Sequence, residues 1–506
     1  MKKELLVASM LAAFFFAAGT VRAQSVDQKI QSLEQELSQL KEQQVELKKE
    51  ATAAAAAMPS FSYRPGNGLN IEAADKSWGL RSTVETHFRS EFESGRDQVG
   101  RSRGELMGRR FRPGMLYCIN NCLWEIEATL DLDGFGTGNA WNNARTGATS
   151  ILQRGAVNFH GENLSPWLPT IQFGMEVQNA SGGSLARQGS GATGAQAEYD
   201  LLTRNNGFNT GRAGTGMVLN WDDKDLSGIG IPGRITKLQL GMSNVAEAED
   251  GSQINSDRKN FNLYMGIQPF SQVKNMWLSG LTFEYGVWFC NNDTRTSTST
   301  CVDRYRIQDH GDGGRQSLFD SGAASVGDGL QTAMGPGVVW NVGPYTFRMM
   351  GSFSGGEDRG GTPGKKRAHD FLIGHDLFLW SPKGFLTGSS TETGSVLVGT
   401  HFERTDISCG DRSRPCTGGV SGSSGNNFRR NRIMLREWDL WYFVAPRMSI
   451  GTSFLWYDAS NLKNGFNQAG NNLGLCSRNA TATATNCRAG FGGDWVDVML
   501  NWRYTF

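Results

Sequence analysis

The sequence has no run of apolar residues long enough to cross a bilayer as a helix. Only 38% of the 506 residues are hydrophobic, and no stretch reaches the about 18 apolar residues that a spanning helix needs. The net charge is also small, because the chain has 50 basic and 49 acidic residues. Such a balance favours neither a nucleic-acid partner nor binding to an acidic membrane surface.

Motifs of common enzymes are missing as well. The chain contains no G-x-S-x-G, no H-E-x-x-H and no phosphate-binding P-loop. The G-x-G-x-x-G match at Gly228–Gly233 contains Pro232 and precedes a strand-like segment, whereas a dinucleotide site needs a following helix. Asp309-His310-Gly311-Asp312 could ligate a cation but is more typical of a solvated loop. We therefore expect no catalytic residues, no cofactor and no metal site.

The N-terminus has the parts of a secretory signal peptide. Lys2 and Lys3 precede a mainly apolar run at Leu5–Ala18, and Val21-Arg22-Ala23 offers small residues for cleavage after Ala23. A membrane anchor is the alternative, but the run is short and no stop-transfer flank follows. We predict that residues 1–23 are removed and that the mature chain is exported.

Cysteine usage agrees with export. The eight cysteines form four neighbouring couples, which are Cys118/Cys122, Cys290/Cys301, Cys409/Cys416 and Cys476/Cys487. An even number of cysteines in an exported chain favours disulfides, and pairing within each couple is the simplest of several connectivities. Metal binding is the alternative, although no couple has zinc-ribbon spacing or a neighbouring histidine.

Residues 24–58 form a separate helical segment. It carries a heptad pattern of about three repeats, near the lower limit for a coiled coil, with one polar interruption. The core positions are Val26, Ile30, Leu33, Leu37, Leu40, Gln44 and Leu47. A solvated single helix is the alternative. Met58-Pro59 ends the helix, and we expect residues 59–77 to be a linker.

From residue 78 onward, apolar and polar residues alternate. Near the C-terminus, Val498 and Leu500 share one face, and Asn501 and Arg503 share the other. A period of two predicts strands, and about 9–11 residues suffice to cross a bilayer. Sixteen such runs lie at 78–94, 105–118, 122–135, 150–162, 168–178, 212–221, 232–244, 259–269, 277–290, 329–340, 345–354, 369–381, 394–405, 432–444, 447–458 and 494–506. The sequence thus predicts an all-β fold, a 16-stranded antiparallel transmembrane β-barrel over residues 78–506.

The connections between these strands alternate in length. Short ones, such as 119–121, 341–344 and 445–446, would share the side of the C-terminus. The long connections 179–211, 291–328, 406–431 and 459–493 all fall on the other side, as external loops do. Aromatic residues gather near strand ends, among them Trp441, Tyr442 and Phe443. We expect them to form girdles at the membrane interfaces.

Several stretches resemble the phosphate-selective porin O and P family. They are Phe173–Gln178 (FGMEVQ), Leu201–Met217 (LLTRNNGFNTGRAGTGM), Gly343–Arg348 (GPYTFR), His369–Gly388 with its FLTG, Gly394–Asp406 and Trp438–Tyr457. The resemblance covers about 78–506 diffusely. It implies a homotrimer of 16-stranded barrels, each an aqueous channel narrowed by an inward-folded third loop, here 179–211. The family's N-terminal coiled-coil extension also resembles residues 26–50.

Charged residues predicted to face the lumen bear on selectivity. The bases are Arg81, Arg89, Arg110, Arg112, Arg154, Lys237, Arg348 and Arg503, and Arg187, Arg204 and Arg212 lie in or beside the third loop. Arginines along a pore favour anions, because guanidinium groups offer paired donors to phosphate. The acids on the same face are Glu85, Glu91, Glu125, Glu127, Asp131, Asp133, Glu176, Glu284, Glu403 and Asp497. The wall as a whole is therefore not basic, and segment 179–211 contains no lysine to match the family's lysine-rich phosphate site.

We expect a porin of a Gram-negative outer membrane, surrounded by lipid and lipopolysaccharide. It would pass small hydrophilic solutes, with inorganic anions such as phosphate as candidates, and residues 24–58 could bind peptidoglycan. Two other functions stay open. A structural tether to the cell wall would use the barrel as its anchor. A barrel-embedded hydrolase would need Ser or Asp converging with His87, His160 or His401, which the alternation places inside the barrel.

Overall fold

The computed structural model divides the chain into two compact units, residues 1–60 with 73–75, and residues 61–72 with 76–506. The described residues are 26–64, 68–94, 103–130, 132, 152–175, 216–244, 259–292, 306–308, 317–320, 329–356, 366–381, 393–409, 431–445, 448–461 and 494–505. In the first unit, helix α2 spans Val26–Ala57 and ends where the Met58-Pro59 pair predicted. Its apolar heptad positions Ile30, Leu33, Leu37, Leu40 and Leu47 are all exposed in the single chain.

Within these described ranges, the structure contains no helix that is both long and apolar enough to cross a membrane.

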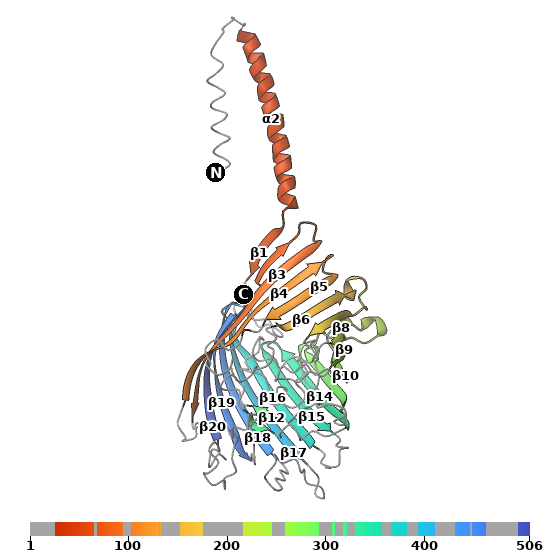
Figure 1. Cartoon of the computed structure of the whole chain (residues 1–506), viewed down its shortest axis with the longest axis vertical. Coiled ribbons are helices and arrows are strands. Elements are labelled where there is room, and N and C mark those ends of the chain that lie inside the picture. The colour runs from red at the N-terminus through yellow and green to blue at the C-terminus, as the bar shows by residue number, and fades with distance from the viewer. Residues whose placement is uncertain are drawn as a thin grey trace. The chain divides into compact units, whose positions relative to one another are not determined.

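The second unit is built on one large sheet (Figure 1). Its strands are β1 (Ser60–Arg64), β2 (Gly68–Glu72), β3 (Trp78–Ser94), β4 (Arg103–Ile119), β5 (Trp124–Leu130), β6 (Leu152–His160), β7 (Thr170–Met175), β8 (Gly216–Asp225), β9 (Arg234–Asn244), β10 (Lys259–Gln268), β11 (Leu281–Asn292), β14 (Gly329–Val342), β15 (Tyr345–Gly356), β16 (Lys366–Trp380), β17 (Val396–Cys409), β18 (Asn431–Ala445), β19 (Met448–Asn461) and β20 (Asp494–Thr505). A separate pair, β12 (Arg306–Gln308) and β13 (Ser317–Asp320), lies in the connection between β11 and β14.

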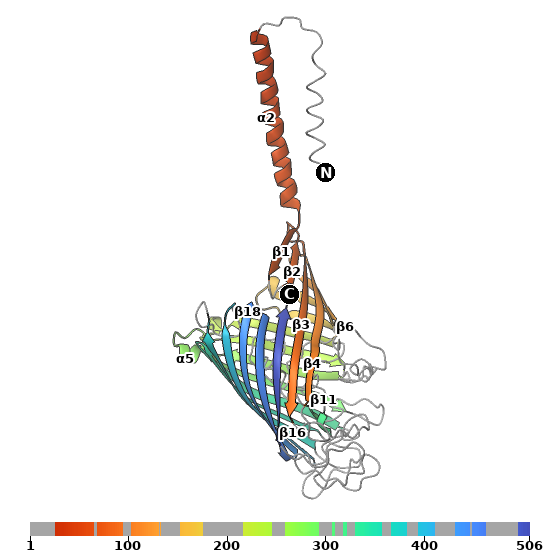
Figure 2. The ribbon, with the colours of Figure 1, turned by 90° about the vertical axis from the view of Figure 1, so that its left-hand side faces the viewer.

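Sixteen strands close into an antiparallel ring, as the alternation predicted. From β3 onward each strand of the large sheet pairs with the next one along the chain, and β20 pairs with β3 from Val496↔Ser94 to Thr505↔Glu85. Figure 2 shows this closure, where blue β20 lies beside orange β3. Each of the sixteen predicted ranges overlaps one observed strand. The connections 176–215, 293–328, 410–430 and 462–493 all leave one end of the ring, whereas 343–344 and 446–447 join strands at the other.

The segment expected to be a linker contains β1 and β2. Strand β2 pairs with β3 from Leu69↔Ser82 to Glu72↔Gly79, and β1 pairs with β2. Because β20 ends opposite Glu85, β2 continues along the same edge of β3 beyond the end of β20. The segment expected to be a linker therefore contains two five-residue strands that the sequence pattern did not single out.

One predicted strand begins later than expected. Residues Met276–Ser279 form a helical turn, α5, before β11 starts at Leu281. The Asn275 side chain accepts a hydrogen bond of 2.9 Å from the Trp277 backbone N–H, which caps the turn and stops the strand from extending backward. Two short 3₁₀ turns, η1 (Gly161–Asn163) and η4 (Ser227–Ile229), lie at the same end of the ring. The G-x-G-x-x-G match falls in η4 and the residues after it, and is a turn as predicted.

The turn between β4 and β5 holds three consecutive residues in the left-handed region. Asn120, Asn121 and Cys122 have φ values of 55°, 54° and 56°. Asparagine tolerates this conformation better than most residues because its short polar side chain can satisfy nearby backbone groups. The Cys118–Cys122 disulfide closes the same turn with a Cα–Cα distance of 4.5 Å.

Candidate functional site

Side chains on the barrel strands alternate between the interior and the outer surface. On β20, Asp497, Asn501 and Arg503 are buried, whereas Val498 and Leu500 are exposed. The alternation predicted for the terminal strand is therefore confirmed. Exposed apolar residues with the same outward orientation on neighbouring strands are Phe88, Phe92, Phe371, Leu377, Trp438, Leu440, Tyr442, Ile450 and Phe454.

The aromatic triplet on β18 is divided between the two faces. Trp441 and Phe443 are buried inside the ring, where they pack in a cluster with Phe378 and Leu397. Only Tyr442 is exposed on the outer surface. The expectation that all three form an interfacial girdle was wrong, because adjacent residues on a strand point to opposite faces.

Several of the predicted lumen-facing bases contact polar neighbours on the wall. The Arg89 Nε donates to Asn501 Oδ1 at 2.9 Å. The Arg348 Nη2 lies 2.6 Å from Asp376 Oδ2, and the Lys237 Nζ lies 3.8 Å from Asp222 Oδ1. Neighbouring groups on the wall therefore already contact these bases.

The other predicted bases have different positions. Arg81 is exposed and donates to Asn70 Oδ1 at 3.0 Å, on the part of β3 that pairs with β2 rather than with β20. Arg112 lies opposite Glu85 in the register of β3 and β4. The side chains of Arg110 and Arg154, and the whole of Arg187, Arg204 and Arg212, lie outside the described residues.

A row of polar side chains crosses five neighbouring strands inside the barrel. It runs from Arg348 on β15 through Asp376, His401 and Asp439 to Ser453 on β19. The His401 Nε2 lies 3.3 Å from Asp376 Oδ1, and its Nδ1 lies 3.2 Å from Asp439 Oδ2. Ser453 Oγ donates to Asp439 Oδ1 at 2.5 Å. Apart from Arg348, whose side chain is 12% exposed, these residues are buried.

The strand register produces this row. Gly374 lies opposite both Arg348 and His401, and Gly399 lies opposite both Asp376 and Asp439. Each glycine leaves space for the longer side chains on either side. Alternation predicted that Arg348 and His401 face inward but gave no reason to single out Asp376 or Asp439. Finding them from sequence would require the pairing of three consecutive strands.

A second group of buried side chains lies on β18 to β20 and β3. The guanidinium of Arg503 stacks on the Trp441 ring at 3.9 Å. His87 Nε2 lies 2.9 Å from Asn501 Oδ1, the same oxygen that accepts from Arg89. The wall in this region is therefore a connected layer of polar and aromatic side chains.

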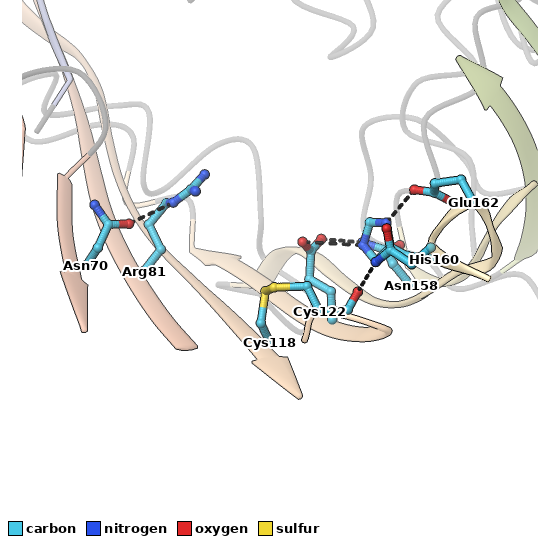
Figure 3. The surroundings of a disulfide bond; sticks show 9 residues. Asn70, Arg81, Cys118, Cys122, Asn158, His160 and Glu162 are labelled. Carbon is cyan, nitrogen blue, oxygen red and sulfur yellow. Dashed lines mark hydrogen bonds and ion pairs between the residues drawn. A yellow bond between two sulfur atoms is a disulfide. The ribbon is translucent and has the colours of Figure 1, made fainter. Parts of the chain in front are cut away.

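A third polar cluster lies near the disulfide, at the end of the ring with the short turns (Figure 3). His160 Nδ1 lies 2.8 Å from Glu162 Oε1, and its Nε2 lies 3.5 Å from Glu125 Oε2. Thr170 Oγ1 donates to Glu162 Oε2 at 2.7 Å. Burial raises the pKa of Glu162, but the hydrogen bonds from His160 and Thr170 outweigh it and hold the pKa below its ordinary value.

Only one predicted cysteine couple falls wholly within the described side chains. Cys118 and Cys122 form a disulfide, which confirms local pairing for this couple. Cys301, Cys416, Cys476 and Cys487 lie outside the described residues, as do the side chains of Cys290 and Cys409. Their pairing stays a prediction.

Comparisons with known proteins find similar structures but no related sequence. No family model matches the chain, and no curated protein matches it. The trimer form of OmpT, an outer-membrane protein of Vibrio cholerae, has 8% identity and a TM-score of 0.45, over 84% of this chain and 99% of that one. The outer-membrane channel DcaP of Acinetobacter baumannii has 7% identity and a TM-score of 0.41, over 84% and 97%. Salmonella typhi OmpF has 10% identity and a TM-score of 0.40, over 88% and 100%. Membership of the porin O and P family stays a prediction.

Proposed function

We propose that this chain is a porin in the outer membrane of a Gram-negative bacterium, where it lets small hydrophilic solutes diffuse passively. The observation that carries the proposal is the closed ring of sixteen strands with polar residues inside and exposed apolar residues outside. Single-chain barrels of this size leave an aqueous lumen, whereas eight-stranded barrels are filled by side chains. Passive diffusion through such a lumen requires no catalytic residues.

The outer surface supports a membrane location. Residues such as Phe371, Leu440 and Phe454 are exposed on strand after strand, and contiguous apolar surface beyond a few hundred Å² is uncommon on soluble monomers. In a bilayer, contact with lipid would remove the free-energy cost of exposing this apolar surface to water. The predicted signal peptide supplies the route of export.

One group of charged residues lies on the outer surface toward the end with the long loops. Arg404 Nε and Arg432 Nε both lie 2.8 Å from Asp406 carboxylate oxygens, and the Arg436 guanidinium lies 4.5 Å from the centre of the Trp456 ring. Arg404, Asp406 and Arg432 lie toward the strand ends that connection 410–430 joins, on the side of the long loops, whereas Arg436 lies further along β18, opposite Phe402. Charges are tolerated near an interface but not at the bilayer midplane. Guanidinium groups there are suited to the phosphates of lipopolysaccharide.

The exposed heptad face of α2 supports a homotrimer. Ile30, Leu33, Leu37 and Leu40 would be covered by the same positions of other copies in a coiled coil. The barrel sequence resembles a family of trimers, which makes three copies the expected number. Peptidoglycan is a further candidate partner of this segment.

Anion selectivity, with phosphate as the first candidate, is the finer part of the proposal. Arg348 and Lys237 have acidic neighbours, so they offer less to a passing anion than their number suggests. For a preference for phosphate, the first candidates are therefore Arg187, Arg204 and Arg212, which the sequence places in or beside the third loop.

The two alternative functions have less support. A hydrolase needs a nucleophile bonded to its base, but Ser453 donates to Asp439 rather than to His401. A tether would use α2 in the same way as a porin does, and would differ only in having no conductance.

Single-channel recording in planar bilayers tests the proposal. The refolded full-length mature chain is measured under a salt gradient, and phosphate is then titrated against the chloride current. Conductance with an anion-selective reversal potential and phosphate block supports the full proposal. Conductance without block, or with cation selectivity, leaves a general porin. A correctly folded protein that never conducts would overturn the channel and favour the tether.

A further inference from the structure

We propose that His401, Glu437 and Asp439 form a binding site for a divalent transition-metal ion, with Zn²⁺ as the expected occupant, inside the barrel wall. One nitrogen or oxygen from each residue lies within 4.8 Å of the other two, and all three residues are buried. This inference goes beyond passive diffusion, and metal binding can be measured without any conductance.

The register of β17 and β18 brings the three residues together. His401 lies directly opposite Glu437, and Asp439 is two residues further along the same face of β18, opposite Gly399. Because Gly399 has no side chain, the imidazole of His401 can reach toward Asp439. Two adjacent strands of the sheet thus provide all three candidate ligands.

Two distances within the cluster are compatible with ligation of one metal ion. Ligand atoms about 2.1 Å from a tetrahedral Zn²⁺ lie about 3.4 Å from one another. The His401 Nδ1 is 3.2 Å from Asp439 Oδ2 and 3.9 Å from Glu437 Oε2, which brackets that spacing. A direct charge-assisted hydrogen bond would be about 2.7–2.9 Å long. Both His401 Nδ1 and Asp439 Oδ2 are fully buried, and neither atom has a partner with hydrogen-bond geometry.

Surrounding residues hold the ligands as metal sites require. Histidine ligands usually present their second nitrogen to a carboxylate, which fixes the orientation of the ring. Here Asp376 Oδ1 lies 3.3 Å from His401 Nε2, close to but not in hydrogen-bond geometry, and Arg348 holds the other oxygen of Asp376 at 2.6 Å. Ser453 binds Asp439 Oδ1, so that Oδ2 points to the cluster. Asp376, Arg348 and Ser453 are positioning residues in this arrangement.

Charge balance also favours a dication. Asp376, Glu437 and Asp439 bring three carboxylates into the wall, and Arg348 contributes one positive charge. A histidine that ligates a metal is neutral, so in the metal-bound state the five side chains carry a net charge of −2, which one divalent ion neutralises. Buried charge without compensation is costly, because the desolvation of each ion takes several kcal/mol. Nitrogen and carboxylate ligands together suit Zn²⁺ rather than Mg²⁺ or Ca²⁺, which prefer oxygen alone.

Metal content of the folded barrel tests the proposal. The untagged, oxidised full-length mature chain is refolded in detergent, stripped with a chelator and titrated with Zn²⁺ by calorimetry. Bound zinc is then measured after gel filtration, and Co²⁺ is used as a spectroscopic substitute. We expect one high-affinity Zn²⁺ per chain, and a visible Co²⁺ absorption that indicates nitrogen and oxygen ligands.

Variants assign the metal to this cluster. His401→Gln and Asp439→Asn should weaken Zn²⁺ binding by about 100-fold, and Asp376→Asn by about tenfold. Gly374→Ala should also weaken it and change the Co²⁺ spectrum, since the added Cβ would lie 2.7 Å from His401 Cδ2. Matched controls are His87→Gln and Asp370→Asn, which alter a buried inward histidine and a buried inward carboxylate elsewhere on the wall.

Folding is monitored separately through heat-modifiable migration on gels, so that a misfolded variant is not counted as a loss of binding. Zinc binding that is absent from the folded wild-type chain would overturn the proposal. Binding that survives in folded His401→Gln and Asp439→Asn would also overturn it, and would place the metal elsewhere in the chain. A loss in both control variants equal to that in His401→Gln would contradict the assignment as well.

Discussion

The guanidinium carbon of Arg503 lies 3.9 Å from the centre of the Trp441 ring, although the two residues come from strands that do not pair with each other. Strand β19 separates them, and its residue Gly451 lies opposite Trp441. A Cβ on Gly451 would collide with the indole ring, so the glycine provides the space through which Trp441 reaches Arg503. A desolvated cation–π contact of this kind contributes about 2 kcal/mol.

Replacing Gly451 with alanine should therefore destabilise the barrel. The added methyl group would displace Trp441 and separate it from Arg503, and overpacking of this type costs about 1–3 kcal/mol. Urea unfolding of the refolded protein in detergent, followed by tryptophan fluorescence, measures the change. Gly228→Ala is the control, because a Cβ at that position meets nothing within 4 Å. Equal midpoints for the two variants would contradict the role given to Gly451.

The barrel itself could be predicted because its signal is local. Every spanning strand must show an apolar face to lipid and a polar face to the lumen, so a period of two recurs from residue 78 to the C-terminus. The number of strands and the alternation of connections follow from that period. Strands β1 and β2 were not predicted because each has only five residues, too few for a clear alternation. Their position depends on the part of β3 that does not pair with β20.

The internal contacts could be predicted only in part. Alternation gave the inward orientation of Arg348 and His401, but their neighbours depend on the register of four strands. A shift of one residue in register reverses every side chain on a strand, so Asp376 and Asp439 could not be paired with His401 from composition. Trp441 is a similar case. Its position among aromatic residues suggested the membrane interface, but the inward orientation of its side chain depends on which face of β18 points to the lumen.

Removing one partner of the Arg348–Asp376 ion pair should destabilise the barrel strongly, whereas replacing both partners by apolar residues should destabilise it much less. Arg348→Met leaves a buried carboxylate without its closest cation, and losses of about 3–5 kcal/mol are typical for one-sided removal. The double variant Arg348→Met with Asp376→Leu removes both charges, and should recover much of that loss. Unfolding midpoints for the wild type, the two single variants and the double variant give the coupling energy. A double variant that is less stable than Arg348→Met would contradict this expectation.

Glu162 should make the barrel less stable in acid. Its pKa in the folded chain is below the ordinary value of 4.5, because His160 and Thr170 bind the ionised carboxylate. A lowered folded pKa means that the stabilisation is present above about pH 4.5, and is lost as pH falls through the folded pKa. Unfolding midpoints measured between pH 7 and pH 3 should therefore fall less steeply in Glu162→Gln than in the wild type. Parallel pH profiles would show that the contacts of Glu162 contribute nothing measurable.

The exposed heptad face of α2 should control the stability of the oligomer. Leu33→Asp with Leu40→Asp places charges at two positions that a trimeric coiled coil would bury. We expect the trimer of the full-length mature chain to dissociate at a lower temperature on semi-native gels, while each barrel keeps its heat-modifiable migration. Gln28→Asp with Gln35→Asp is the matched control, since these positions lie on the opposite side of the helix and should leave the trimer unchanged. A wild-type protein that sediments as a monomer in detergent would sink the trimer. Equal dissociation temperatures in the two double variants would instead mean that contacts between the barrels, and not α2, hold the trimer together.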